Sequence, residues 1–272
     1  MNHKKSRASE LFYSFFSIFQ PRQGRGESIA EEWQAHVLPH SPIQALAPNL
    51  WHVTGIVSSL VPPREMVIYR SPDSTLLIHS AIALAEAEQT QLEALGKPKI
   101  MIVPNRIHRL DAKVYKQRYP ELVVVAPEAA KPYVEAIVPV DAIAEDFLPD
   151  YGITCHQPAG IRPQELVYEL QLPSGKALIF TDILFNLTDS YLERYVPRSK
   201  LMTRWLGAGG YLGITALGQR FFMTDKVAYR GWLETLADSI SPLRVIAVAH
   251  GEPITADCAE RLREAATRLS KV

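Results

Sequence analysis

The chain has only two cysteines among its 272 residues, Cys155 and Cys258, and they stand far apart. A disulfide framework needs more cysteines, and a cysteine-based zinc cage needs close pairs such as CxxC, so both are excluded. A chain with so little cysteine fits a reducing compartment, and we expect a cytoplasmic protein.

An excess of charge of either sign is also missing. The 29 basic residues balance the 29 acidic ones, which gives a formal net charge of zero. No overall field therefore draws the protein to nucleic acid or to an anionic membrane, and any partner must be recognised locally. We expect no nucleic-acid partner, and we keep a small-molecule ligand as the candidate.

Near the N-terminus, residues 11–19 are apolar and aromatic and follow Lys4, Lys5 and Arg7. This stretch is much shorter than the ~20 apolar residues of a membrane-spanning helix, and no cleavage site of the A-x-A kind follows it. It fits an appended helix or packing arm. Weak peripheral contact with a membrane and a poorly ordered tail remain the alternatives.

Residues 1–48 are therefore interpreted as an N-terminal arm with a helix-to-loop lead-in, which prolines at 39, 42 and 48 interrupt. The domain is expected over residues 49–272, and 47% hydrophobic residues are ample for its core. In its first half the patterns predict strands and helices in alternation after an opening hairpin. The expected strands are 50–53, 66–69, 75–79, 100–103 and 122–125, and the expected helices are 85–95, 112–118 and 128–137.

The second half repeats this order of hairpin and helix. Strands are predicted at 152–156, 165–172, 177–182 and 244–249, and helices at 225–240 and 257–269. A helical insertion is expected at about residues 186–222. Two such halves suit two sheets packed face to face with helices outside, which is an α/β (α+β) architecture.

Two polar residues stand where apolar strands end, and they are the first candidates for a site. Asp182 ends the run 177–182, and His250 follows 245–249 and precedes Gly251. A carboxylate at such a position is costly to desolvate unless it is paired, caps a helix or binds a cation. For His250, a hydrogen bond to a neighbouring loop is the simpler alternative.

A third polar cluster follows the strand 100–103, in the sequence Pro104-Asn105-Arg106-Ile107-His108-Arg109-Leu110-Asp111. Together with the Phe-Thr-Asp motif at 180–182 and the Ala-His-Gly motif at 249–251, it resembles the metallo-β-lactamase superfamily in motif order. The match is closer to a divergent family of that superfamily that lacks the full metal signature, and it covers about residues 49–265. The resemblance implies a four-layer αββα sandwich.

The superfamily's His-x-His-x-Asp-His loop would lie at this cluster, so the resemblance also implies which ligands remain. Asn105 stands where the first histidine would be, and His108 and Asp111 remain as plausible ligands. Asp182 matches the bridging aspartate and His250 the last histidine. No histidine occupies the turn at 158–161, although His156 is near.

His108, Asp182 and His250 could hold one divalent metal ion, most naturally zinc, because catalytic zinc takes three protein ligands and keeps an open position. Asp182 and His250 are then the catalytic candidates. Asn105, Arg106 and Arg109 are candidates for orienting the site or binding an anionic substrate, although the arginines could also be plain surface charges.

Two hypotheses follow from this inventory. One is a ligand-binding protein or pseudoenzyme that kept the fold without a dinuclear metal site. The other is a mononuclear metal-dependent hydrolase of an ester or phosphoester.

Two further features belong to the fold rather than to the chemistry. His79 ends the strand 75–79 and is expected to hydrogen-bond a site loop. The glycine-rich stretch 207–213 follows a predicted helix instead of a strand, so it lacks the context of a nucleotide-binding loop.

Overall fold

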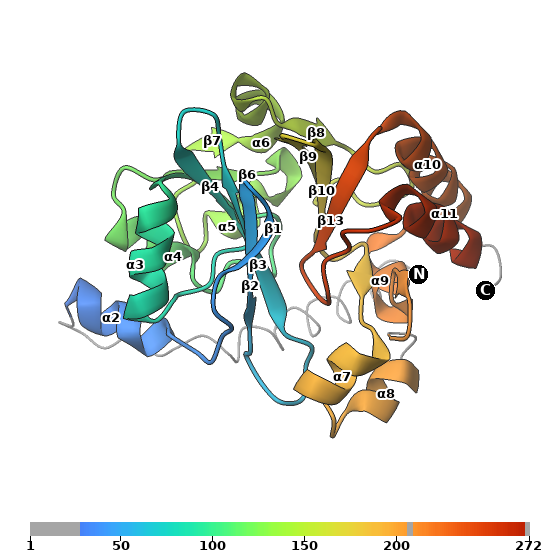
Figure 1. Cartoon of the computed structure of the whole chain (residues 1–272), viewed down its shortest axis with the longest axis horizontal. Helices are drawn as coiled ribbons and strands as arrows, with labels where there is room; N and C mark the ends of the chain where they lie inside the picture. The colour runs from blue at the N-terminus through green and yellow to red at the C-terminus, as the bar shows by residue number, and fades with distance from the viewer. Residues whose placement is uncertain (1–27, 206–208, 270–272) are drawn as a thin grey trace.

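The computed structural model describes residues 28–205 and 209–269. Two β-sheets lie face to face, and helices cover the outer side of each sheet (Figure 1). The apolar stretch at residues 11–19 lies outside the described residues. Within them, no helix is long and apolar enough to cross a membrane.

The larger sheet has the strands in chain order. The first four pair antiparallel, and β4 to β7 pair parallel through helical crossovers. Its strands are β1 Gln44–Ala47, β2 Leu50–Gly55, β3 Arg64–Arg70, β4 Thr75–His79, β5 Lys97–Ile102, β6 Val123–Ala126 and β7 Ala142–Ile143.

The smaller sheet has the order β13-β10-β9-β8. β9 Val167–Leu172 and β10 Gly175–Phe180 form the predicted hairpin, and β8 Thr154–His156 extends it. β13 Leu243–Val248 pairs with β10 in parallel. The carboxyl ends of β10 and β13 therefore meet at one edge of the sheet.

The alternation of side chains along the strands builds the layers, because successive residues of a strand point to opposite faces. Ile68, Ile78 and Met101 pack in the cluster under the helices of the larger sheet. Their neighbours Val67, Leu77 and Ile102 pack between the sheets, together with Ile179 and Ala247 of the smaller sheet. The four-layer αββα sandwich is confirmed.

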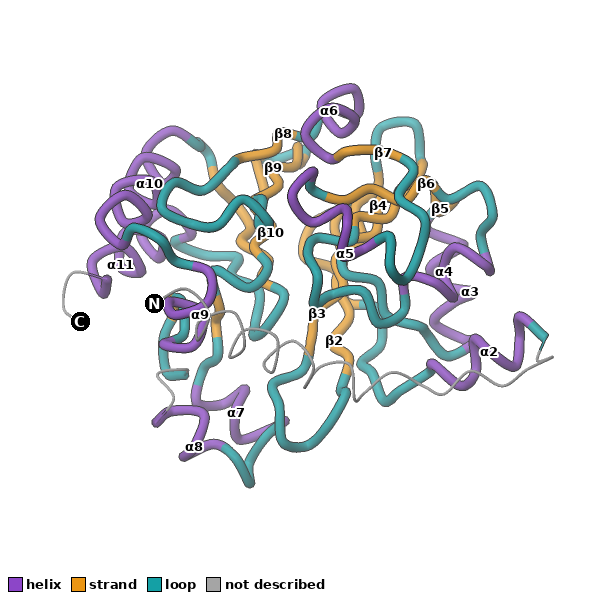
Figure 2. Tube along the Cα trace, turned by 180° about the vertical axis from the view of Figure 1, so that it is seen from behind, coloured by secondary structure: helices purple, strands orange, loops and turns teal. Residues whose placement is uncertain are grey.

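The helices fall into an outer layer on each side and an insertion at one end (Figures 1 and 2). The larger sheet is covered by α2 Ile29–His36, α3 Glu86–Leu95, α4 Ala112–Arg118 and α5 Lys131–Val134. The smaller sheet is covered by α10 Lys226–Ser239 and α11 Cys258–Leu269. Short turns of helix at Glu128–Ala130, Ala144–Phe147 (α6) and Leu148–Tyr151 complete the connections.

The insertion expected at about 186–222 is mainly helical, with a small two-stranded antiparallel sheet. It comprises β11 Phe185–Asn186, α7 Asp189–Tyr195, α8 Lys200–Trp205, β12 Leu212–Gly213 and α9 Ala216–Phe222. Its α7 has a small core of its own around Leu187, Tyr191, Leu192 and Val196. The insertion is tied to the β2–β3 loop, where Ser199 Oγ donates to the Leu60 carbonyl at 3.1 Å.

Two local predictions were wrong in detail. The helix expected at 128–137 is a 3-10 turn followed by the four-residue α5, because Pro132 has no N–H to donate to the Glu128 carbonyl and therefore stands in the first turn of a new helix. The lead-in also contains the edge strand β1, since its prolines flank the residues 44–47 instead of interrupting them. Trp33 of α2 is buried in the core under the larger sheet. The domain boundary expected near Asn49 stays a prediction.

Candidate functional site

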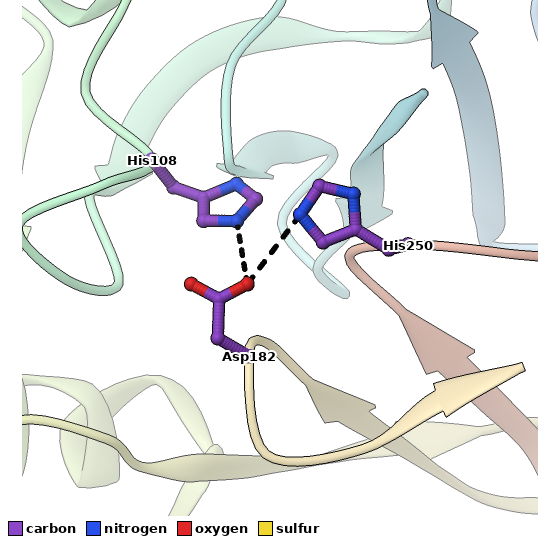
Figure 3. A group of neighbouring side chains, drawn as sticks. All are labelled: His108, Asp182 and His250. Carbon is purple, nitrogen blue, oxygen red and sulfur yellow. Dashed lines mark hydrogen bonds and ion pairs between the residues drawn. The ribbon is translucent and has the colours of Figure 1, made fainter. Parts of the chain in front are cut away.

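His108, Asp182 and His250 meet at the carboxyl ends of the strands (Figure 3). Phe180 of β10 pairs with Val248 of β13, and Asp182 and His250 each follow two residues later. His108 arrives from the loop after β5 of the other sheet. Asp182 Oδ1 lies 3.2 Å from His108 Nε2 and 3.4 Å from His250 Nε2.

The three ligand atoms suit a metal ion. They all lie within 4.8 Å of one another, and no other group of this kind is found among the described residues. Zinc bonds of about 2.0–2.1 Å in a tetrahedral arrangement separate neighbouring ligand atoms by about 3.3 Å. Two imidazole nitrogens and one carboxylate oxygen are also a donor set that zinc accepts, so the residues fit a single ion.

His250 has its ring orientation fixed by the backbone. Its Nδ1 lies 2.7 Å from the carbonyl oxygen of Pro63, which can only accept, so Nδ1 carries a proton and donates it. In the neutral ring, the lone pair of Nε2 therefore faces Asp182 Oδ1. Phe185 stacks on the ring at 5.4 Å between centroids and supports this orientation. Two hydrogen-bond acceptors face each other, which requires a proton or a cation between them.

His108 is less constrained. Its Nδ1 lies 2.8 Å from Ser80 Oγ, and a hydroxyl can donate or accept, so either tautomer is satisfied. Burial lowers the pKa of His108, although the negative charge of Asp182 opposes the shift. The ring is accordingly neutral and able to offer the lone pair of Nε2.

The side chain of Asn105 connects the loop that carries His108 to two buried carboxyl groups. Its Nδ2 donates to Asp182 Oδ2 at 2.7 Å and to Glu165 Oε1. Its Oδ1 accepts from the amides of Ile107 and His108. Every hydrogen-bonding position of the side chain is filled. Asn105 therefore orients the site, and it turns Oδ1 of Asp182 toward both histidines.

Glu165 and Asp182 are two buried carboxyl groups with opposite behaviour. Burial and the charge of Asp182 raise the pKa of Glu165 well above its usual range. Burial alone would raise the pKa of Asp182 too, but the charges and hydrogen bonds of His108 and His250 outweigh it and hold that pKa very low. The pKa values of the two buried carboxyl groups are thus shifted in opposite directions.

Asp111, the other plausible ligand of the loop, lies in a separate cluster. Its carboxylate pairs with Arg64 and with His36 Nδ1 at 2.9 Å, and it accepts from the Ala83 amide at 3.0 Å. These contacts tie α2, β3 and the loop after β4 to the start of α4. Asp111 is a structural residue and not a ligand.

His79 and His156 lie outside the group formed by His108, Asp182 and His250. His79 is fully buried, and its Nε2 lies 3.3 Å from Thr181 Oγ1, so the predicted hydrogen bond to the site loop is confirmed. Burial lowers the pKa of His79 to about 3, and the ring stays neutral. His156 pairs with Glu169 at 2.9 Å on β8 and β9.

Arg106 and Arg109 both reach Tyr133 of α5. The guanidinium of Arg106 lies 4.4 Å from the centre of its ring, and Arg109 donates to its carbonyl oxygen. Burial and the neighbouring charge of Arg106 lower the pKa of Arg109. The structure thus brings two like charges together on the loop of His108.

Three residues of the site were missed at the sequence level. Ser80 supports His108, Pro63 supports His250 and Glu165 supports Asn105. Glu165 carried a usable signal, because it is a carboxylate that stands two residues before the strand β9. Pro63 carried none, because it acts through its backbone carbonyl.

Comparisons with known proteins support the same architecture. No family model and no curated protein matches the sequence. Solved structures match at low identity but over nearly their whole length. The metallo-β-lactamase FIM-1 from Pseudomonas aeruginosa, solved in a mono-zinc form, has a TM-score of 0.56 and 11% identity, and the match covers 86% of this chain and 98% of that one.

Two further metallo-β-lactamases agree. DIM-1, solved after exposure to ceftazidime, has a TM-score of 0.55 and 13% identity, with 85% of this chain and 98% of that chain covered. The enzyme from Erythrobacter litoralis has a TM-score of 0.55 and 14% identity, with 83% and 96% covered. The chain has a metallo-β-lactamase-like fold.

Proposed function

We propose that this chain, built on the metallo-β-lactamase fold, holds one divalent metal ion and hydrolyses an ester or a phosphoester. The ion, zinc in the first place, would be held by Nε2 of His108, Oδ1 of Asp182 and Nε2 of His250. The observation that carries the proposal is the pair of acceptors at His250 Nε2 and Asp182 Oδ1, 3.4 Å apart, with the proton of His250 engaged at Pro63.

A metal ion with three protein ligands polarises a substrate oxygen and lowers the pKa of a water molecule to about 7. The protein residues supply the orientation. Asn105 holds the second oxygen of Asp182 and also binds Glu165, whose raised pKa favours the uncharged acid. With Glu165 uncharged, the cluster would have one ionised carboxylate, which suits one dication better than two.

The direction of substrate access follows from exposure. The side chain of His250 is 17% exposed, whereas those of His108 and Asp182 are 2% and 6% exposed. We propose that the substrate approaches from the side of His250. Arg106 and Arg109 would supply positive charge for an anionic group, since guanidinium binds carboxylate or phosphate by paired hydrogen bonds.

The test is a hydrolysis assay on chelator-stripped protein before and after addition of zinc, with p-nitrophenyl acetate, p-nitrophenyl phosphate and bis(p-nitrophenyl) phosphate. We expect zinc-dependent turnover that falls at least about 100-fold in Asp182→Ala and His250→Ala. His156→Ala is the matched control, because this histidine pairs with Glu169 outside the cluster. Turnover that does not depend on zinc, or that is unchanged in both variants, contradicts the proposal.

A second candidate rests on the same geometry. A proton can fill the gap in place of a metal ion, and His250 would then donate from both nitrogens and form an ion pair with Asp182. The protein would in that case be a ligand-binding pseudoenzyme. A pseudoenzyme would show no zinc-dependent turnover in the hydrolysis assay, and it would still bind an anionic ligand in the presence of chelator.

A further inference from the structure

The loop between β2 and β3 carries no charged residue. Its sequence is Ile56-Val57-Ser58-Ser59-Leu60-Val61-Pro62-Pro63. The side chain of Leu60 is 59% exposed, and Val57 and Val61 are only partly buried. Because water disfavours exposed apolar surface, a loop of this composition marks a contact surface when a second exposed apolar segment lies beside it.

A second exposed leucine lies on the neighbouring helix α8. Ser199 Oγ donates to the Leu60 carbonyl at 3.1 Å, which fixes the loop against the start of α8. Two residues later, Leu201 is 83% exposed. The β2–β3 loop lies beside α7 and α8 at the lower edge of both views (Figures 1 and 2). We call the surface formed by the β2–β3 loop, α7 and α8 the insertion face.

The insertion carries an excess of positive charge. Residues 186–222 contain five basic and two acidic residues, whereas the chain as a whole is neutral. Both acidic residues pair with basic ones, since Glu193 lies 2.6 Å from Lys200 and Asp189 lies 3.5 Å from Arg204. The other basic residues are all exposed, and they are Arg194, Arg198 and Arg220. The excess of three positive charges is therefore local to the insertion and lies at the surface.

Three occupants could cover the insertion face, and their charge distinguishes them. Residues 1–27 contain five basic and two acidic residues, so this segment has the same sign as the insertion. A second copy in a two-fold dimer would bring the face against itself. Like charges repel each other in both cases. An anionic lipid surface offers charge of the opposite sign and an apolar layer for the leucines.

We propose that the insertion face docks on an anionic lipid surface. Leu60 and Leu201 enter the boundary between headgroups and acyl chains, and the basic residues of α7 and α8 bind lipid phosphates. The β2–β3 loop ends at Pro63, whose carbonyl accepts from His250 Nδ1 at 2.7 Å. Docking therefore places the lipid surface on the side of the most exposed residue of the candidate site. The docking itself does not rest on the proposed function.

The test measures binding of the full chain to phosphatidylcholine vesicles with and without phosphatidylserine. We expect binding to the anionic vesicles that added salt weakens, because salt screens charges at a surface. Leu201→Asn should weaken this binding about 5- to 10-fold, since its side chain no longer enters the apolar layer. Val227→Asn is the matched control, because this side chain is 79% exposed but belongs to α10.

A second pair of variants tests the charges. Arg194→Gln with Arg198→Gln should weaken binding to the anionic vesicles about 10- to 30-fold. Arg261→Gln with Arg263→Gln removes the same charge from α11, where both arginines form surface pairs, and should leave binding unchanged. All the substituted side chains are exposed, so we expect every variant to fold, which circular dichroism checks.

A wild-type protein that does not bind the anionic vesicles overturns the proposal. Binding that is unchanged in the leucine and arginine variants overturns it as well, and assigns the contact to residues outside the insertion face. A wild-type dimer that Leu201→Asn converts to a monomer assigns the face to a second copy instead. None of these outcomes depends on zinc, so a failure of the proposed function is recognised separately.

Discussion

The side-chain amide of Asn105 donates to Asp182 Oδ2 at 2.7 Å and joins this carboxylate to the buried acid Glu165. The amide thus bridges two buried carboxyl groups. Because the carbonyl oxygen of the same side chain holds the amides of Ile107 and His108, one residue sets the geometry of the loop and of the carboxylate.

Replacing Asn105 tests this relationship. Asn105→Ala leaves the buried carboxyl groups of Asp182 and Glu165 without their shared donor, and we expect a loss of about 2–4 kcal/mol in the free energy of unfolding. Zinc affinity should fall at least about tenfold, because Asp182 is no longer oriented. Urea unfolding and zinc titration measure the two effects.

Asn49→Ala provides the comparison, since the side-chain amide of Asn49 donates to the Gln171 carbonyl at 3.1 Å, away from the site. We expect it to cost about 1 kcal/mol and to leave zinc affinity unchanged. An Asn105→Ala protein that behaves like Asn49→Ala would show that the amide bridge has no special role.

Asp111 gives a prediction about pH. Burial would raise its pKa, but the charge of Arg64 and the hydrogen bonds from His36 and Ala83 outweigh burial and lower it. The ionised carboxylate therefore stabilises the fold above its unfolded pKa of about 3.9. That contribution is lost as the pH falls through the lower pKa of the folded protein.

We accordingly expect Asp111→Asn to cost about 3–5 kcal/mol at pH 7, because it leaves the charge of Arg64 buried without its partner. The difference from the wild type should shrink as the pH falls below about 3.9. Chemical denaturation across this range checks both statements. Glu193→Gln breaks a surface pair with Lys200 and should change the free energy of unfolding far less than Asp111→Asn does. Loss of zinc binding in a folded Asp111→Asn protein would contradict its structural role.

Gly251 tests the turn that presents His250. Its φ is +110°, which favours glycine, and a Cβ there would overlap the backbone of Asn186. Gly251→Ala should destabilise the protein by more than about 2 kcal/mol and weaken zinc binding. Gly231→Ala is the control, because nothing lies near its Cβ and it stands within α10, where alanine stabilises a helix by about 0.5–1 kcal/mol. Similar stability for the two variants would contradict this account.

The strands could be predicted from the sequence because an apolar run that ends in a polar residue is a local pattern. This pattern and the resemblance to the metallo-β-lactamase superfamily together singled out the three residues of the cluster, and the parallel pairing of β10 with β13 brings Asp182 to His250. The predicted helix α4 agrees with the structure to the residue, Ala112–Arg118. The spacing of residues in the loop predicted metal ligands less reliably. Asp111 follows His108 at a plausible interval for a ligand, but it forms an ion pair with Arg64, which lies far away in the sequence.

The supporting residues could not be found in this way. Pro63 acts through a backbone carbonyl of the β2–β3 loop, which reaches His250 only when the larger sheet packs on the smaller one. Such contacts depend on tertiary structure and leave no pattern in one sequence. The strand β1 was not predicted for a related reason. Its four residues at the sheet edge are too few to show the alternation of apolar and polar side chains that marks a strand.

The two arginines give a prediction about ligands. Arg106 and Arg109 repel each other on a half-buried surface, and a bound anion would relieve that repulsion. Arg109→Gln should weaken binding or competitive inhibition by inorganic phosphate about 5- to 10-fold. Arg261→Gln, which pairs with Glu264 on the surface of α11, is the control of equal charge. Equal phosphate affinity in both variants would count against an anion site.

The central claim is tested most directly by counting metal ions. Protein purified without chelator or a histidine tag, and then dialysed against trace zinc, should contain one zinc per chain by elemental analysis. Asp182→Ala and His250→Ala should contain none, while His156→Ala keeps the full amount. A wild-type protein free of metal, or variants that retain the ion, would contradict a metal centre at His108, Asp182 and His250.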